Sequence, residues 1–292
     1  MSRASNGQTE IEYDTFGAPT DPAVLLIMGY TAQMTAWDER FCGKIADRGY
    51  FVIRFDNRDV GLSSKTEGTA PSLLSLVVAV QSGEPLPDVP YTLSDMADDG
   101  LAVLDDLGIE RAHVVGASMG GMIAQQLAID HPERVISLTS IMSTTGNPEV
   151  GQASDEAMMA LVSPMPTERD DIIERSVEVA KLLTGAYFDE ERARSRAAAA
   201  YDRSFHPTGA GFQMAAIAAS GDRTEPLAGL SVPTLVVHGD ADPLVNPSGG
   251  EATAAAVPGA TLLLVPEMGH DLPPARWDEI VEAITDLAAS AA

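Results

Sequence analysis

The chain has 292 residues, of which 45% are hydrophobic and 21% are charged, so its composition is that of a globular protein and excludes an intrinsically disordered one. Its 18 Lys and Arg residues against 43 Asp and Glu give a net charge of −25, which repels phosphate backbones and anionic lipid headgroups. We therefore expect neither nucleic acid nor a membrane as a partner.

A single cysteine, Cys42, permits no intramolecular disulfide, so nothing in the chain calls for an oxidising compartment. The first residues lack the continuous apolar segment of a secretory signal, and the longest apolar stretch, at 73–80, is too short to cross a bilayer. These features predict a cytoplasmic protein.

Short apolar runs bounded by Gly, Pro or Asp recur along the chain and predict strands. They lie at 23–29, 50–56, 112–118, 135–142, 233–240 and 261–266, after a predicted antiparallel hairpin at 1–22. None alternates between apolar and polar residues, so we expect strands buried on both faces of a parallel sheet. The pattern at 92–108 predicts a helix that begins after Thr92 and exposes its acidic pairs, Asp98/Asp99 and Asp105/Asp106.

Strands that alternate with helices predict an α/β fold with a mostly parallel, doubly wound sheet, and ligands then bind beyond the carboxyl ends of the strands. The alternation breaks at 146–227, where Ala, Met, Glu and Arg dominate. We predict a core of 1–145 and 228–292 and an inserted helical cap of 146–227, placed to cover the site as a lid.

The segment Gly116-Ala117-Ser118-Met119-Gly120 follows a predicted buried strand and opens a predicted helix. G-x-S-x-G in this context is typical of a nucleophile elbow, in which small neighbours leave room for a strained serine. The alternative is a glycine-rich packing turn with a capping serine. We favour Ser118 as a nucleophile.

A serine hydroxyl needs a base to take its proton and a carboxylate to orient that base. His270 directly follows the last predicted strand, whereas His238 lies within a strand and suits packing; an ordinary loop histidine is the alternative for His270. After the preceding strand come Asp240 and Asp242. We favour Asp242, because Asp240 is close enough to the strand end to serve as a turn or cap residue.

The oxyanion of a tetrahedral intermediate needs two preorganised donors, normally the amide after the nucleophile and one from an early loop. The backbone N–H of Met119 is the expected first donor. The N–H of Tyr30, which follows Gly29, is the expected second.

These segments, with FDNRDVGLSS at 55–64, HGDADPLV and PEMGH, resemble the α/β-hydrolase fold superfamily over essentially the whole chain. Within it the chain is similar to carboxylesterases of the aclacinomycin methylesterase type, which share an LxMG loop, a D-x-R-D-x-G-x-S segment and a helical cap. The resemblance implies serine esterase chemistry, with Ser118, Asp242 and His270 as the triad and Tyr30 and Met119 as amide donors.

Two details of the pattern bear on the site. Many relatives begin the oxyanion loop with His-Gly where this chain has Met28-Gly29, a change that mainly alters packing because the donor is a later amide. Asp56 and Arg58 are candidates for substrate binding, but we favour a buried structural pair that fixes the loops.

The leading hypothesis is hydrolysis of a small-molecule carboxylic ester through an acyl-enzyme, with no metal or organic cofactor. The same triad also serves cofactor-free peroxidase chemistry, carbon–carbon bond hydrolysis or acyl transfer, and these alternatives stay open. A non-catalytic ligand receptor is disfavoured because no triad member is missing. The methionines of the insert, Met158, Met159, Met165 and Met214, either line an apolar acyl pocket or pack the cap helices.

Overall fold

Eight strands form one sheet in the order β1-β2-β4-β3-β5-β6-β7-β8 in the computed structural model, which describes residues 2–82, 84, 86–87, 89–163 and 165–291. The strands are β1 (Ser2–Asn6), β2 (Thr9–Phe16), β3 (Ala23–Ile27), β4 (Phe51–Phe55), β5 (Ala112–Ala117), β6 (Val135–Ile141), β7 (Thr234–Gly239) and β8 (Thr261–Val265). The pairs β1–β2 and β2–β4 are antiparallel and the other pairs are parallel. The mostly parallel α/β sheet and its leading hairpin are therefore confirmed.

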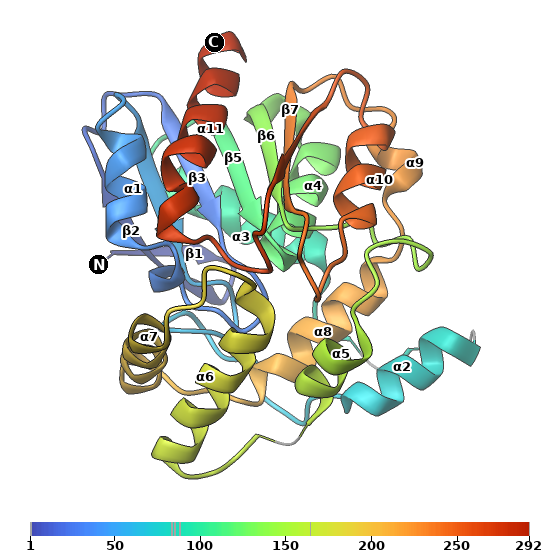
Figure 1. Ribbon diagram of the computed structural model, residues 1–292. Coiled ribbons are helices and arrows are strands. Elements are labelled where there is room, and N and C mark those ends of the chain that lie inside the picture. Colours follow the sequence, from blue (N-terminus) through green and yellow to red (C-terminus); the bar gives the residue numbers. More distant parts are fainter. Residues whose placement is uncertain (1, 83, 85, 88, 164, 292) are drawn as a thin grey trace.

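Helices cover both faces of the sheet (Figure 1). One face carries α1 (Glu39–Ala46) and α11 (Trp277–Ala291), and the other carries α3 (Leu93–Asp106), α4 (Met119–Asp130) and α10 (Ser248–Ala256). The short α9 (Thr224–Leu227) packs against α4 and α10. Single-turn 3-10 helices lie at Met34–Ala36, Pro132–Arg134 and Pro274–Arg276. Each face of the sheet thus has its own apolar core.

The strand β8 departs from the prediction that all the apolar runs are buried on both faces. Leu262 is 37% exposed and Leu264 is 41% exposed. The reason is position, because β8 is the last strand of the sheet and has a neighbour, β7, on one side only. An apolar run alone does not distinguish an edge strand from a central one.

The structure describes five helices between β6 and β7; α9 is the last of them, and the other four lie below the carboxyl ends of the parallel strands in Figure 1. They are α5 (Asp155–Val162), α6 (Arg169–Thr184), α7 (Glu190–Arg203) and α8 (Gly209–Ser220). A further helix, α2 (Leu73–Ser82), follows β4 and packs against α8. We propose that α5 to α8 form the cap. None of the described helices is long and apolar enough to span a bilayer.

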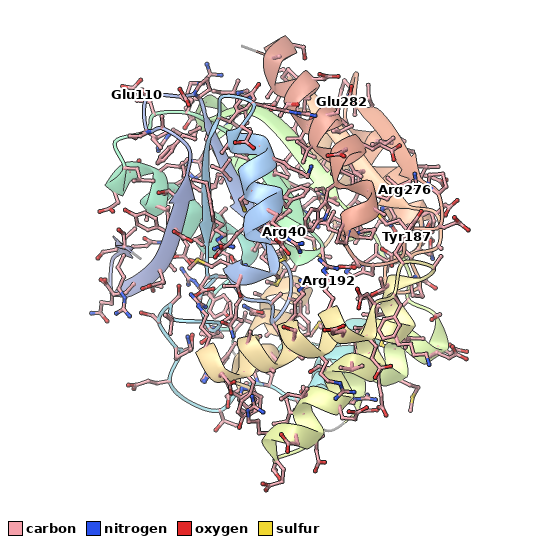
Figure 2. All side chains as sticks on the ribbon, turned by 60° about the vertical axis from the view of Figure 1, so that its left-hand side comes forward. Arg40, Glu110, Tyr187, Arg192, Arg276 and Glu282 are labelled. Carbon is pink, nitrogen blue, oxygen red and sulfur yellow. The ribbon has the colours of Figure 1, made fainter. Side chains whose placement is uncertain are left out.

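The cap is fastened to the core along the side that carries α1 and α11, where Figure 2 shows Arg40 of the core and Arg192 of the cap. Their guanidinium groups lie 5.2 Å and 5.7 Å from the centre of the Trp277 ring. Nearby, Arg276 Nε donates to the hydroxyl of Tyr187, a residue between α6 and α7, at 2.8 Å. These cation–π contacts and the part-buried hydrogen bond join the two parts.

The helix α3 begins as predicted, since the Thr92 hydroxyl accepts from the Asp95 N–H and the Asp95 carboxylate accepts from the Thr92 N–H. The expectation that its acidic pairs face water is wrong for Asp99, whose side chain is 1% exposed. Two hydrogen bonds join Asp99 to Arg58, from Nε at 2.6 Å and from Nη2 at 2.7 Å. Burial raises the pKa of the Asp99 carboxyl, and the Arg58 charge opposes that shift.

Replacing Asp99 by Ala should lower the free energy of unfolding by about 3 kcal/mol, because the change leaves the Arg58 guanidinium in a largely buried place without its counter-ion. The matched control is Asp98→Ala on the same helix turn, whose side chain is 49% exposed and pairs with the partly exposed His131. That change should cost less than about 1 kcal/mol. Urea unfolding of both variants measures the difference, and equal losses would show that the Arg58–Asp99 pair does not hold this region together.

Candidate active site

Ser118 lies at the sharp turn where β5 ends and α4 begins, with φ 58° and ψ −123°. A side chain on Gly116 would collide with the carbonyl of Gly120, and one on Gly120 would collide with the carbonyl of Ile27. The elbow therefore needs glycine at both positions, as the sequence pattern predicts. Its strained backbone raises the Ser118 hydroxyl above the carboxyl edge of the sheet, over the amino terminus of α4.

Three side chains from separate loops meet at this edge. His270 Nε2 lies 3.0 Å from Ser118 Oγ, and His270 Nδ1 lies 2.7 Å from Asp242 Oδ2. Asp240, the alternative carboxylate, is exposed and accepts instead from the backbone N–H of Glu267 at 2.7 Å. The chain of hydroxyl, imidazole and carboxylate has the contacts that general-base activation of a serine requires.

The Asp242 carboxylate is buried, and both of its oxygens have hydrogen-bond partners. Its Oδ1 accepts from the backbone N–H groups of Leu244 at 2.8 Å and Val245 at 2.9 Å, which leaves Oδ2 for His270. The fully buried His238 donates from Nε2 to the Val245 carbonyl at 2.7 Å and lies 3.6 Å from Asp242 Oδ2. Burial lowers the pKa of His238, so its ring is neutral beside the carboxylate.

The loop that carries His270 is held by the end of α6. The His270 N–H donates to the Leu183 carbonyl at 2.7 Å, and the Gly269 N–H donates to the Thr184 carbonyl at 3.3 Å. Next to His270, Asp271 forms ion pairs with two arginines of α7. The Asp271 oxygens lie 3.6 Å from Arg192 Nη1 and 3.7 Å from Arg196 Nη1. The imidazole is thus positioned by the cap as well as by the core.

The loop after β3 lies directly against the serine. A side chain on Gly29 would come within 2.9 Å of Ser118 Cβ, so only glycine allows this loop to lie so close to Ser118. Among the described residues no acceptor receives the N–H of Tyr30 or of Met119, so both remain free to bind an oxyanion. Burial raises the pKa of the Tyr30 phenol to about 12, which keeps it uncharged.

The structure does not join Asp56 and Arg58 into the pair that the sequence predicts. Arg58 binds Asp99, whereas the fully buried Asp56 forms an ion pair with Arg203 of α7 at 2.8 Å and accepts from the Met34 N–H at 2.7 Å. Each residue fixes a loop, as expected, but the partners come from distant segments. Sequence spacing within one loop could not indicate either of them.

Sequence analysis did not predict a role for two glutamines near the site. Gln33 donates from Nε2 to the carbonyls of Ala200 and Ser204 in the cap, at 2.7 Å and 2.8 Å. Gln213 of α8 accepts from the Thr31 N–H at 2.8 Å and donates to the Arg58 carbonyl at 2.9 Å. Both connect the cap to the loop that follows β3, and no local pattern marks either one.

The methionines of the cap do not share one environment. Met158 is 43% exposed, Met159 is 62% exposed and Met165 is 55% exposed, whereas Met214 is partly buried in α8. Packing between cap helices therefore does not bury the first three.

Comparison with known proteins supplies an independent view of the chain. A family model for the alpha/beta hydrolase fold matches residues 22–273. Rhodomycin D methylesterase DauP from Streptomyces sp. (strain C5) is 31% identical over 92% of this chain and 91% of its own length. Rhodomycin D methylesterase DnrP from Streptomyces peucetius is 29% identical over 96% of this chain and 95% of its own length.

Solved structures agree on the fold. A meta-cleavage product hydrolase from Pseudomonas fluorescens IP01 superposes with a TM-score of 0.78 at 20% identity, covering 100% of this chain and 98% of its own. An esterase from Thermogutta terrifontis gives a TM-score of 0.73 at 22% identity, covering 100% of this chain and 99% of its own.

Replacing Asp242 by Asn should slow the reaction of Ser118 with a fluorophosphonate by about three to four orders of magnitude. The carbonyl of the new side-chain amide still accepts from the Leu244 and Val245 N–H groups, but its NH2 then faces His270 and imposes the wrong imidazole tautomer. The matched control, Asp240→Asn, should react within about threefold of the wild-type rate. Rates of labelling measured by intact-protein mass spectrometry decide the assignment, and a larger loss in the Asp240 variant would reverse it.

Proposed function

Because the chain belongs to the α/β-hydrolase fold family, we propose that it is a serine esterase that cleaves a carboxylic ester through an acyl-enzyme on Ser118. The observation that carries this proposal is the hydrogen-bonded series from Ser118 Oγ through His270 to Asp242, with contacts of 3.0 Å and 2.7 Å. A serine held this way is a nucleophile at neutral pH, which an isolated hydroxyl is not.

In the first half of the reaction Ser118 Oγ attacks the ester carbonyl while His270 Nε2 takes the hydroxyl proton. The backbone N–H groups of Tyr30 and Met119 bind the oxyanion of the tetrahedral intermediate. Asp242 stabilises the imidazolium that forms. The intermediate collapses when His270 returns the proton to the alkoxy oxygen, which releases the alcohol and leaves an acyl group on Ser118.

In the second half a water molecule replaces the alcohol. His270 takes one of its protons, the hydroxide oxygen bonds to the acyl carbon, and the new tetrahedral intermediate expels Ser118 Oγ, which regains its proton from His270. The products are one carboxylic acid and one alcohol for each ester and water consumed. The chain's own groups supply every proton transfer in this sequence.

The substrate we propose is a small or medium-sized apolar ester, and a methyl ester is the first candidate for its alcohol part. The methyl ester follows from the names of the two relatives DauP and DnrP, which match more than nine-tenths of this chain. A net charge of −25 disfavours polyanionic substrates.

Replacing Ser118 by Ala should lower kcat toward p-nitrophenyl acetate, butyrate and octanoate by about five to six orders of magnitude, with the enzyme still folded. The wild-type series measured in buffer without added metal also gives the preferred acyl length. A Ser118→Ala variant that keeps wild-type turnover would overturn the mechanism. Wild-type enzyme that is inactive on all of these esters would instead favour carbon–carbon bond hydrolysis, peroxide-dependent chemistry or acyl transfer, which product analysis distinguishes.

A further inference from the structure

Gln213 is a polar side chain of the cap that is completely buried, with 0% of its surface exposed. Its Oε1 accepts from the Thr31 N–H at 2.8 Å and its Nε2 donates to the Arg58 carbonyl at 2.9 Å. A backbone N–H only donates and a carbonyl only accepts, so these two partners fix the orientation of the amide. Gln213 therefore joins the loop after β3 to the loop after β4 from a third element, α8.

The bond to Thr31 holds an unfavourable backbone conformation. Thr31 has φ 57°, a left-handed value that a β-branched residue rarely adopts, in a tight turn closed by the Ala32 N–H and the Gly29 carbonyl at 3.2 Å. If the Thr31 N–H had no acceptor, Thr31 could adopt the right-handed conformation, which is sterically more favourable. Gln213 supplies that acceptor.

The same turn carries the Tyr30 N–H, which we have assigned to the oxyanion. Gly29 on one side of Tyr30 lies against Ser118, and Thr31 on the other side is bound by Gln213. The peptide before Tyr30 is therefore fixed where Gly29 packs against Ser118. The peptide after Tyr30 is fixed by the hydrogen bond from the Thr31 N–H to Gln213. Because an oxyanion donor loses its effect when it is misplaced by about 1 Å, the second contact bears on the rate.

We propose that Gln213 is a positioning residue that holds the Tyr30 amide in the oxyanion hole, so that the cap contributes to catalysis and does not serve only as a cover. This inference rests on the proposed esterase function. It assigns Gln213 no contact with the reacting atoms, since its effect passes through the turn.

Replacing Gln213 by Leu removes both hydrogen bonds at similar volume and tests the proposal. Active sites are counted with a fluorophosphonate, and kcat is expressed per titrated site, so loss of folded protein does not lower it. We expect kcat to fall about 10- to 100-fold with KM within about threefold of wild type. The inhibition constant of an alkyl boronic acid, which forms a tetrahedral adduct on Ser118, should rise by a similar factor.

Ser220→Ala is the matched control, because it lies on the same helix and removes a different bond between cap and core, the one from the Leu93 N–H to Ser220 Oγ at 3.0 Å. Its kcat per site should stay within about twofold of wild type. Should Gln213→Leu fail to fold, Gln213→Met decides. Its unbranched side chain has about the length of glutamine but carries neither the amide oxygen that accepts from Thr31 nor a donor for the Arg58 carbonyl, so its kcat per site should fall by a similar factor.

A kcat per site and a boronic acid affinity that both stay within about twofold of wild type would overturn the proposal while leaving the esterase function intact. The same holds if Gln213→Met shows a wild-type kcat per site. A wild-type enzyme that hydrolyses none of the test esters overturns the proposed function, and this inference with it.

Discussion

The site depends on one strained residue, Ser118, which the fold holds with a positive φ at the end of β5. Such a conformation costs on the order of 1–3 kcal/mol and persists only where its surroundings fix it. The Ser118 N–H donates to the Ile141 carbonyl at 2.9 Å, and the Ser118 carbonyl accepts from Ser143 Oγ at 2.8 Å. Ile141 is the last residue of β6 and Ser143 follows it, so the strand next to β5 holds the elbow in place.

The other groups of the proposed site lie in loops that follow β3, β7 and β8, and the cap contacts two of these loops. The end of α6 binds the backbone of the His270 loop, and α8 binds the turn that contains Tyr30 through Gln213. An ion pair from α7 to the fully buried Asp56 adds a third attachment. These contacts make α6, α7 and α8 part of the structure that positions the loops of the proposed site.

Sequence analysis predicted the features that local pattern determines. The apolar runs predicted the strands, and G-x-S-x-G between a predicted strand and a predicted helix indicated the sharp turn at Ser118. The placement of His270 and Asp242 beside Ser118 could be anticipated because parallel strands bring their following loops to one edge. The contacts of Asp99, Asp56 and Gln213 were not found, since each depends on a partner far along the chain whose approach is set by tertiary packing. The exposure of Leu262 and Leu264 in β8 was not predicted either, because a single apolar run does not show where its strand lies in the sheet.

The central claim is a covalent acyl intermediate on Ser118, and the most direct test is how that intermediate divides between two acceptors. The methyl, ethyl and p-nitrophenyl esters of one acid are hydrolysed in buffer containing a fixed concentration of propanol, and the ratio of propyl ester to free acid is measured. A common acyl-enzyme gives the same ratio for all the esters, since the leaving group has departed before the acceptor reacts. A ratio that changes with the leaving group would contradict the acyl-enzyme and with it the role of Ser118 as nucleophile.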